Sequence, residues 1–294
     1  MKSLKVNKLK LFNATKYGNF KWMPDEQFIR LQYALKMRKD LNLENPKTFN
    51  EKIQWLKLND RNPKYTQLVD KYAVRKFVKE RIGGEYLVPI YGVYENDEAI
   101  DFDALPDKFV LKMTHTSGGV FIIEDKARIN HDKLKAEIDK WFDRNYYWVH
   151  REWPYKNVQP KIMAEKFMVD ESEKDLKDYK FFCFEGEPKF MFVASERGKE
   201  AKFDFFDLDF NQLPVMQQGE NSDQQIKKPN KFDEMIELAR TLSEGIPHVR
   251  VDLYNINSEI YFGELTFYHN GGYGPFIPEA FDYKFGEYLQ LPGN

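Results

Sequence analysis

The stretch that decides the fold is VRVDLYNINSEIYFGELTF, residues Val249 to Phe267. Apolar and polar residues alternate on both sides of NINS, residues 255–258. This alternation around a cluster of turn-forming residues is typical of two antiparallel strands joined by a turn. We therefore predict a β-hairpin across the whole stretch.

Folding this hairpin about Ser258 would place Asp252 opposite Glu264 and Arg250 opposite Thr266, all on one face of the sheet. Two facing carboxylates repel each other unless a cation lies between them, and hard oxygen ligands suit Mg²⁺. An arginine beside them indicates a phosphate group held by that metal. The alternative is the solvated face of an ordinary hairpin, and a one-residue bulge would change which side chains share a face.

The composition describes a globular chain with a substantial core. Of its 294 residues, 42% are hydrophobic and 31% are charged, and the net charge of −2 argues against non-specific binding to nucleic acid. The aromatic share of 16% is compatible with stacking on a sugar or a nucleotide, although aromatic cores are the commoner cause.

A single cysteine, Cys183, excludes internal disulfides and cysteine-based zinc sites, and its apolar neighbours place it in the core. No apolar run approaches the length of a membrane span, and the N-terminus has no continuous apolar segment like that of a secretory signal. We therefore expect a cytoplasmic protein. Six lysines before the first acidic residue, Asp25, would suit peripheral contact with the anionic inner face of a membrane; a frayed basic tail is the alternative.

The first third of the chain is predicted to be mostly helical. Apolar residues recur at helical spacing in residues 24–41, 51–58 and 66–82, and the last of these helices should stop at Gly83-Gly84. A strand follows over residues 87–94.

The segment KFVLKMTHTSGGVFIIED, residues 108–125, predicts two strands joined by a Thr-Ser-Gly-Gly loop, with Lys112 in the first strand. Small residues let backbone N–H groups approach a phosphate, and a lysine on a strand can neutralise it. The pattern is not the Walker motif, because the lysine precedes the glycines. A plain hairpin is the alternative.

Further along, we predict a charged helix over residues 131–145, a hairpin over 178–195 that turns at Glu185-Gly186, and a helix over 229–246. Trp148 and Trp153 would stack on a sugar ring or pack against their own domain. The later segment HNGGYGPF is expected to be a flexible glycine-rich loop.

Taken in order, these segments resemble the ATP-grasp superfamily, and within it the TupA-like (teichuronopeptide biosynthesis) amidoligases, over roughly residues 49–276. The resemblance implies an α+β fold in which two α+β subdomains clasp ATP, with a helical N-terminal region. The implied parts are a helical region over residues 1–86, a lid subdomain over 87–168 and a subdomain carrying the metal site over 169–294.

The resemblance also implies roles for individual residues. Lys71 and Lys112 would reach the ATP phosphates. Glu165 and the Lys166 carbonyl would accept from the adenine amine, and the Met168 N–H would donate to the ring. The expected nucleotide-binding set is Lys71, Lys112, His115, Ser117, Gly118, Gly119, Glu165, Lys166, Met168, Asp178 and Lys180.

Arg250 and Lys180 would act on the transferring phosphate, while Asp252 and Glu264 would bind Mg²⁺. Many members of the family have asparagine two residues beyond the metal glutamate, where this chain has Thr266. Either Thr266 serves as a ligand, or Asn270 substitutes for it, or water fills the position.

The implied reaction is an ATP- and Mg²⁺-dependent amide synthesis. A substrate carboxylate attacks the γ-phosphate to give an acylphosphate, and an amine then displaces phosphate. By resemblance the carboxylate would be a uronic acid or amino acid, as a small molecule or in a cell-surface polysaccharide, and the amine an amino acid or amino sugar. The acceptor site would lie near HNGGYGPF and the segment from Trp148 to Trp153. The sequence assigns neither the identity of the substrates nor the oligomeric state.

Three alternatives remain. Asp207-Leu208-Asp209 has the Asp-x-Asp form of metal-dependent glycosyltransferases, although AKFDFFDLDF also alternates like a strand with polar outer residues. A non-catalytic binding protein on the same scaffold would explain Thr266. A kinase that phosphorylates a hydroxyl would have the same nucleotide site.

Overall fold

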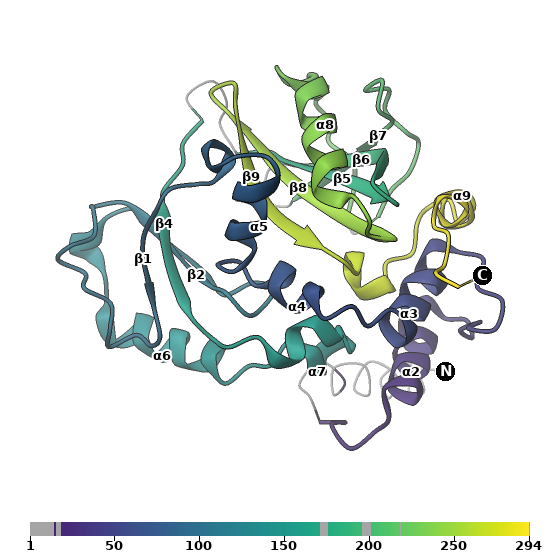
Figure 1. Cartoon of the computed structure of the whole chain (residues 1–294), viewed down its shortest axis with the longest axis horizontal. Helices are drawn as coiled ribbons and strands as arrows, with labels where there is room; N and C mark the ends of the chain where they lie inside the picture. The colour runs from purple at the N-terminus through teal and green to yellow at the C-terminus, as the bar shows by residue number, and fades with distance from the viewer. Residues whose placement is uncertain (1–14, 16–18, 171–175, 196–200, 218, 294) are drawn as a thin grey trace. The chain divides into compact units, whose positions relative to one another are not determined.

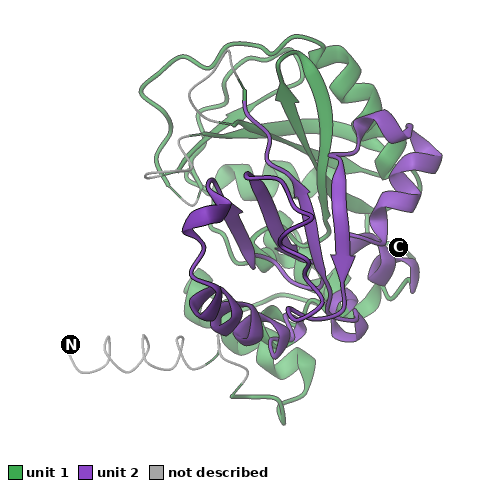
Figure 2. Cartoon of the chain, turned by 90° about the vertical axis from the view of Figure 1, so that its left-hand side faces the viewer, with its two compact units in different colours: residues 1–62, 148–153, 170–294 green, residues 63–147, 154–169 purple. Residues whose placement is uncertain are grey.

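The computed structural model describes residues 15, 19–170, 176–195, 201–217 and 219–293 (Figure 1). Five of the six N-terminal lysines, all except Lys21, therefore lie outside the described residues. The chain forms two compact units: residues 1–62, 148–153 and 170–294 make unit 1, and residues 63–147 and 154–169 make unit 2 (Figure 2). Within the described ranges, no helix is long and apolar enough to cross a membrane.

Unit 1 is built on a five-stranded antiparallel sheet with the strand order β7-β6-β5-β8-β9. The strands are β5 (Asp178–Phe184), β6 (Glu187–Ser195), β7 (Lys202–Phe206), β8 (His248–Ile256) and β9 (Glu259–Thr266). The β5–β6 turn at Glu185-Gly186 is at the predicted position, and both residues have positive φ angles, 50° and 87°. Such turns match the right-handed twist of the paired strands.

The helices of unit 1 are α2 (Asp25–Met37), α3 (Phe49–Asn59), α8 (Phe232–Ser243) and α9 (Ala280–Tyr288), together with the 3₁₀ segment η4 (His269–Gly272). Helix α8 packs on strands β5, β6 and β8, and α3 packs on α9 and η4. The short helix α7 (Tyr147–His150) and the 3₁₀ segment η3 (Trp153–Asn157) lie where the chain crosses between the units.

Aromatic rings fill the core of unit 1. Phe190 stacks on Phe285 at 3.7 Å and on Phe182 at 4.4 Å between ring centroids, and Phe49 meets Phe182 edge-on at 5.9 Å. Cys183 is fully buried next to helix α8, where its Sγ lies 3.8 Å from the Ala239 carbonyl, and burial raises its pKa to about 12. The high aromatic content therefore supplies core, and the thiol is unreactive.

Unit 2 contains a four-stranded antiparallel sheet with the order β1-β4-β2-β3. Its strands are β1 (Ile90–Tyr94), β2 (Phe109–Met113), β3 (Val120–Ile123) and β4 (Ile162–Lys166). Its helices are α4 (Lys64–Val69), α5 (Val74–Arg81) and α6 (His131–Phe142), with 3₁₀ segments η1 (Gly84–Tyr86) and η2 (Lys126–Arg128). Phe109, Leu111 and Ile138 join α6 to one face of the sheet in a continuous apolar cluster.

The prediction of one helix over residues 66–82 is wrong, because the chain breaks between α4 and α5. The Asp70 carboxylate accepts hydrogen bonds from the N–H groups of Tyr72 (2.8 Å) and Ala73 (3.1 Å). An aspartate that binds the backbone ahead of it favours a turn over a continuous helix. Lys71 consequently lies between the two helices.

The units also divide the chain differently from the boundaries expected at residues 86 and 168. Residues 1–62 group with the C-terminal part, since α3 packs on α9 and η4. Helices α4 and α5 group with the four-stranded sheet, where the Lys71 N–H donates to the Thr114 carbonyl at 3.0 Å.

Both tryptophans of the central segment have partners inside unit 1. The guanidinium of Arg151 lies 4.7 Å from the Trp148 ring, and Trp153 donates from Nε1 to the Asp60 carbonyl at 3.0 Å. These contacts favour the packing interpretation over stacking on a sugar.

Gly286 tests the packing of α9 on the start of α3. A Cβ at this position would lie 2.3 Å from the Lys47 carbonyl oxygen and 2.8 Å from the Phe49 nitrogen. Alanine normally favours a helix over glycine by about 1 kcal/mol, but here a backbone clash opposes it. We expect Gly286→Ala to lower the free energy of unfolding by about 1–3 kcal/mol, measured by urea denaturation.

Gly84→Ala is the control, because its Cβ would meet only the Lys79 side chain, at 3.7 Å. We expect that substitution to change stability by less than about 0.5 kcal/mol. Equal effects of the two alanines would contradict the close approach of α9 to α3.

Candidate functional site

The β8–β9 hairpin brings together the residues singled out from the sequence. Asp252 pairs with Glu264 and Arg250 with Thr266, as predicted. The turn itself consists of two residues, Asn257 and Ser258, and is therefore tighter than a turn centred on Ser258. The register then shifts between Asp252 and Leu253, at a β-bulge that restores the predicted pairs.

Glycine stands at this bulge. Gly263 lies between the paired residues Phe262 and Glu264, and a Cβ there would be 3.0 Å from the Asp252 carbonyl oxygen. A glycine at such a close backbone approach is typical of bulges next to functional sites.

Arg250 is the centre of the cluster on this hairpin. It donates to both oxygens of Asp252, from Nε at 2.7 Å and from Nη2 at 2.8 Å. Nη2 also lies 3.0 Å from Thr266 Oγ1 and 3.5 Å from Glu264. Its Nη1 lies 2.7 Å from Nδ1 of His269, a residue that the sequence patterns did not single out. Arg250 as a whole is 7% exposed.

Lys180 also contacts the Asp252 carboxylate. It lies on the neighbouring strand β5, directly opposite Asp252. It forms ion pairs with Asp252 and, at 3.1 Å, with Asp178. Burial alone would raise the pKa of Asp252, but Arg250 and Lys180 hold it below its ordinary value. Asp252 is therefore ionised and shared between two cations.

The oxygen ligands of this cluster suit Mg²⁺ only in part. Within the described residues, no group of three His, Cys, Asp or Glu side chains is placed to hold a metal ion. Mg²⁺ is commonly bound by one or two protein carboxylates, with phosphate oxygens and water completing its shell. Asp252, Glu264 and the Thr266 hydroxyl fit that pattern, and the adjacent cations favour an anionic ligand.

The glycine-rich loop after β9 is buried, contrary to the expectation of a flexible loop. Gly271 and Gly272 have φ angles of 61° and 67°, and both are buried. Gln54 of α3 donates to their carbonyls at 2.9 and 2.6 Å, and Lys57 Nζ donates to that of Gly271 at 2.5 Å. Asn270, the alternative metal ligand, lies beside His269, and its amide donates to Gln217 Oε1 at 3.2 Å.

In unit 2, Lys112 is held by a buried carboxylate. Glu165 on the neighbouring strand β4 forms an ion pair with Lys112 and lies 3.9 Å from Arg75. The side chain of Glu165 thus binds the strand lysine, while the proposed adenine contacts of Lys166 and Met168, at the end of β4, stay predictions.

The Thr-Ser-Gly-Gly loop of unit 2 gathers a second group of expected residues. Lys71 Nζ donates to the Thr116 carbonyl, and Gly118 and Gly119 adopt φ angles of 89° and 63°. Ser117 at the tip is exposed. A Cβ on Gly118 would lie 2.9 Å from the Trp141 ring. Only glycine fits this backbone without strain.

His115 lies under the same loop, 2% exposed. Its Nε2 is 3.0 Å from the Trp141 carbonyl, which makes Nε2 the donor, and Nδ1 is buried without a hydrogen-bond partner within the described part of the chain. Burial lowers its pKa, so the ring is neutral. An unpaired acceptor beside the loop is consistent with a site that a ligand donor completes.

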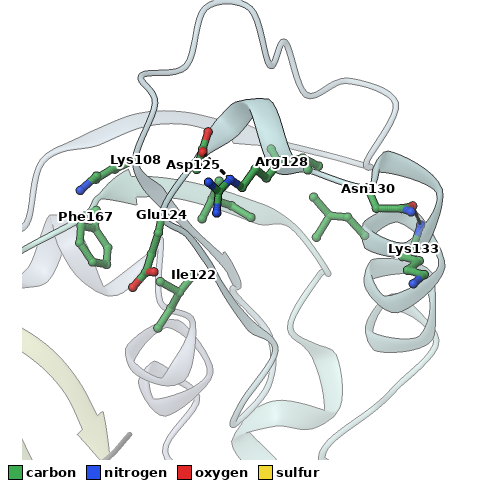
Figure 3. Close-up of a pocket in the computed structure, with 11 residues that line it drawn as sticks. Lys108, Ile122, Glu124, Asp125, Arg128, Asn130, Lys133 and Phe167 are labelled. Carbon is green, nitrogen blue, oxygen red and sulfur yellow. Dashed lines mark hydrogen bonds and ion pairs between the residues drawn. The ribbon is translucent and has the colours of Figure 1, made fainter.

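A separate hollow of about 750 Å³ lies in unit 2 beside the start of α6 (Figure 3). Lys108, Ile122 and Phe167 line it together with Arg128, which forms an ion pair with Asp125 at 3.0 Å. None of the expected site residues lines this hollow.

The Asp-x-Asp sequence has a local structural role. Strand β7 ends at Phe206, so the predicted strand through Phe210 is too long. The Asp207 carboxylate accepts from the N–H groups of Asp209 (3.0 Å) and Asn211 (2.8 Å). This arrangement explains Asp207 as a turn residue.

Sequence patterns also missed a buried pair of opposite charges, Lys57 and Glu152. Lys57 is 0% exposed, and Nζ donates to Gln54 Oε1 at 2.9 Å and to the His150 carbonyl at 3.0 Å. Its signal in the sequence is its position four residues after Ile53, on the apolar stripe of α3. Glu152 is 5% exposed, and nothing local to it indicates its burial.

The two units thus form an α+β protein with two antiparallel sheets, each carrying lysines and carboxylates at its candidate site. The chain belongs to the TupA-like ATP-grasp family, whose family model matches residues 51–290. The predicted family and fold class are confirmed. No curated protein matches the chain.

Several solved structures are similar at low identity. The D-alanine–D-alanine ligase of Bacillus anthracis complexed with ATP is 16% identical, with 68% of this chain and 55% of that chain covered and a TM-score of 0.41. The corresponding ligase of Helicobacter pylori is 13% identical, with coverages of 82% and 69% and a TM-score of 0.42. N5-carboxyaminoimidazole synthase from Aspergillus clavatus, in complex with ADP, is 13% identical, with coverages of 70% and 46% and a TM-score of 0.38. The chain spans about half the length of the Bacillus anthracis enzyme.

The Lys57–Glu152 pair predicts a pH-dependent stability. Burial raises the pKa of Glu152 from 4.5 to about 7, although Lys57 and Lys36 partly offset the rise. The folded state then binds a proton that the unfolded state has released, so this contribution to stability is present below about pH 4.5 and is lost as the pH rises through 7. Burial also lowers the pKa of Lys57 from 10.5 to about 7, and loss of the Glu152 charge would lower it further, which raises the stability of the variant with pH as well. Relative to wild type, Glu152→Gln should therefore gain stability between pH 5 and pH 8, on the order of 2 kcal/mol.

The measurement is urea denaturation of both proteins at pH 5 and pH 8. Glu287→Gln removes a carboxylate at an exposed position, so it controls for the effect of the lost charge alone on the free energy of unfolding. If the difference in the free energy of unfolding between wild type and Glu152→Gln is the same at pH 5 and pH 8, Glu152 ionises as it does in the unfolded chain.

Proposed function

We propose that this chain is an ATP-dependent carboxylate–amine ligase that forms an amide through an acylphosphate. The observation that carries the proposal is the position of Arg250, Asp252 and Glu264 on facing strands of a chain that belongs to the ATP-grasp family. Lys180 from the adjacent strand adds a second cation beside them.

The residues of unit 1 would serve the phosphoryl group. Arg250 and Lys180 would stabilise the negative charge that spreads over the phosphate oxygens during transfer. Asp252 and Glu264, with Thr266 or Asn270, would hold Mg²⁺, which when bound neutralises the phosphates and polarises the transferred group. Asp178 is held by Lys180 and would lie near the nucleotide.

The residues of unit 2 would bind the remainder of the nucleotide. Lys71, Lys112, His115 and the loop from Ser117 to Gly119 would contact phosphates, while Glu165, Lys166 and Met168 would face adenine. Lys112 now pairs with Glu165, so a bound triphosphate would compete with that carboxylate for the lysine.

The substrate carboxylate would attack the γ-phosphate, forming a C–O–P bond while ADP leaves. The amine would then form the C–N bond as phosphate leaves and its own proton is lost. We assign the carboxylate to a uronic acid or amino acid of a cell-surface polysaccharide, on the family resemblance. Neither step needs a nucleophilic side chain, in accord with the inert Cys183.

Thermal-shift measurements test the nucleotide site. Ligands that bind only the folded state raise the melting temperature. With Mg²⁺, we expect ATP to raise it by a few degrees, GTP and UDP-glucose to have little effect, and the double substitution Asp252→Asn/Glu264→Gln to abolish most of the ATP response. A rise in melting temperature with UDP-glucose and none with ATP would contradict the ligase proposal and favour a glycosyltransferase.

Asp207→Asn/Asp209→Asn is the matched control, since it removes two carboxylates outside the proposed site. We expect it to keep the full ATP response, whereas a glycosyltransferase would lose its metal-dependent response to UDP-glucose in this variant.

The reaction itself is tested with ATP, Mg²⁺ and pairs drawn from D-glucuronate, D-galacturonate, L-glutamate and L-alanine. Release of phosphate that requires both a carboxylate and an amine supports ligation. A stable phosphate ester would identify a kinase, and ATP binding without turnover of any pair would favour a binding protein.

A further inference from the structure

Almost all N–H groups of the Arg250 guanidinium donate hydrogen bonds to other residues of the protein. Nε and Nη2 donate to Asp252, and Nη2 also contacts Thr266 and Glu264. One N–H of Nη1 meets His269 Nδ1 at 2.7 Å. Within the described residues, this leaves only the second N–H of Nη1 for a ligand.

The ring of His269 is fixed in one tautomer by a relay behind it. Gln217 donates from Nε2 to the Gly274 carbonyl at 2.7 Å, which orients its Oε1 toward His269 Nε2 at 2.6 Å. Nε2 therefore carries the proton, and Nδ1 is an acceptor for Arg250. Because the ring is 1% exposed and lies beside Arg250, its pKa is well below the ordinary value and the ring stays neutral.

We propose that His269 is a positioning residue for Arg250: by accepting from Nη1 it sets the orientation of the one N–H that remains for the terminal phosphates of a nucleotide. The inference rests on the proposed function, because it takes Arg250 to contact those phosphates. Asp252, with Thr266 and Glu264, holds the Nε–Nη2 side of the guanidinium, and His269 holds the Nη1 side.

The relay also connects the phosphate arginine to the glycine-rich loop. His269 is the first residue of η4. Gln217 accepts a hydrogen bond from Asn270 and donates one to the Gly274 carbonyl. Gln54 donates to the carbonyls of Gly271 and Gly272 in the same loop. A substitution at His269 would therefore act on nucleotide binding through Arg250, without itself touching the ligand.

The test compares the affinities of AMP-PNP with Mg²⁺ and of AMP by isothermal titration calorimetry. AMP lacks the terminal phosphates, so it reports on the rest of the nucleotide site. We expect His269→Leu to weaken AMP-PNP binding about tenfold or more, as expected for a lost hydrogen bond to a charged group, while AMP binding changes less than about threefold. His269→Asn, which keeps an acceptor near the Nδ1 position, should recover most of the AMP-PNP affinity.

His248→Leu is the matched control. In this second buried histidine, Nδ1–H donates to the Cys183 carbonyl at 2.9 Å, and the ring makes no hydrogen bond to Arg250 in the described structure. We expect it to leave the ratio of the two affinities unchanged. If His269→Leu does not fold, Gln217→Leu provides the second variant, with the same direction of effect.

Three results would overturn the inference. Unchanged AMP-PNP affinity in folded His269→Leu would show that Arg250 is positioned without the histidine. An equal loss of AMP affinity would indicate a general structural role. Absence of AMP-PNP binding by the wild-type chain would contradict the proposed function itself, and this inference with it.

Discussion

The buried ion pair between Arg250 and Asp252 constrains the polar groups around it. Two charges removed from water are tolerated only where each is paired and hydrogen-bonded, since an uncompensated buried charge is strongly destabilising. Asp252 is 2% exposed and binds the guanidinium through both oxygens. His269, which faces the same guanidinium, is kept neutral by burial and by that positive charge. Burial and the ion-paired arginine together keep this neighbouring histidine in one protonation state.

Each unit holds a candidate phosphate-binding lysine against a carboxylate from a neighbouring strand. Lys180 is paired with Asp252 in unit 1, and Lys112 with Glu165 in unit 2. A pairing of this kind orders a long side chain, at the cost of competition with any incoming anion. A triphosphate carries several negative charges and can replace a single carboxylate, particularly where a divalent cation would take that carboxylate as its own ligand.

The sequence predicted the β8–β9 hairpin and most of the helices, and it failed where an interaction of one particular side chain decides the structure. Alternation fixed the shared face of Arg250 and Asp252, and the predicted register held because the tighter turn and the bulge at Gly263 offset each other. The helix over residues 66–82 failed because Asp70 binds the backbone ahead of it, a local interaction that periodicity does not report. Lys57 approaches Glu152, and His269 approaches Arg250, only after folding, so no spacing in the sequence could pair them.

The glycine-rich loop shows why composition alone misjudged a segment near the proposed site. Its glycines are required by positive φ angles and by close approach: a Cβ on Gly272 would lie 2.5 Å from Gln54 Nε2, and one on Gly271 would lie 3.0 Å from the His150 ring. Glycine permits such contacts because it has no side chain, and here the freed space is filled by hydrogen-bonding groups of α3. The loop is consequently an ordered part of the polar network that reaches Arg250 through His269, so a ligand that contacted the loop would meet a surface whose geometry is already coupled to Arg250.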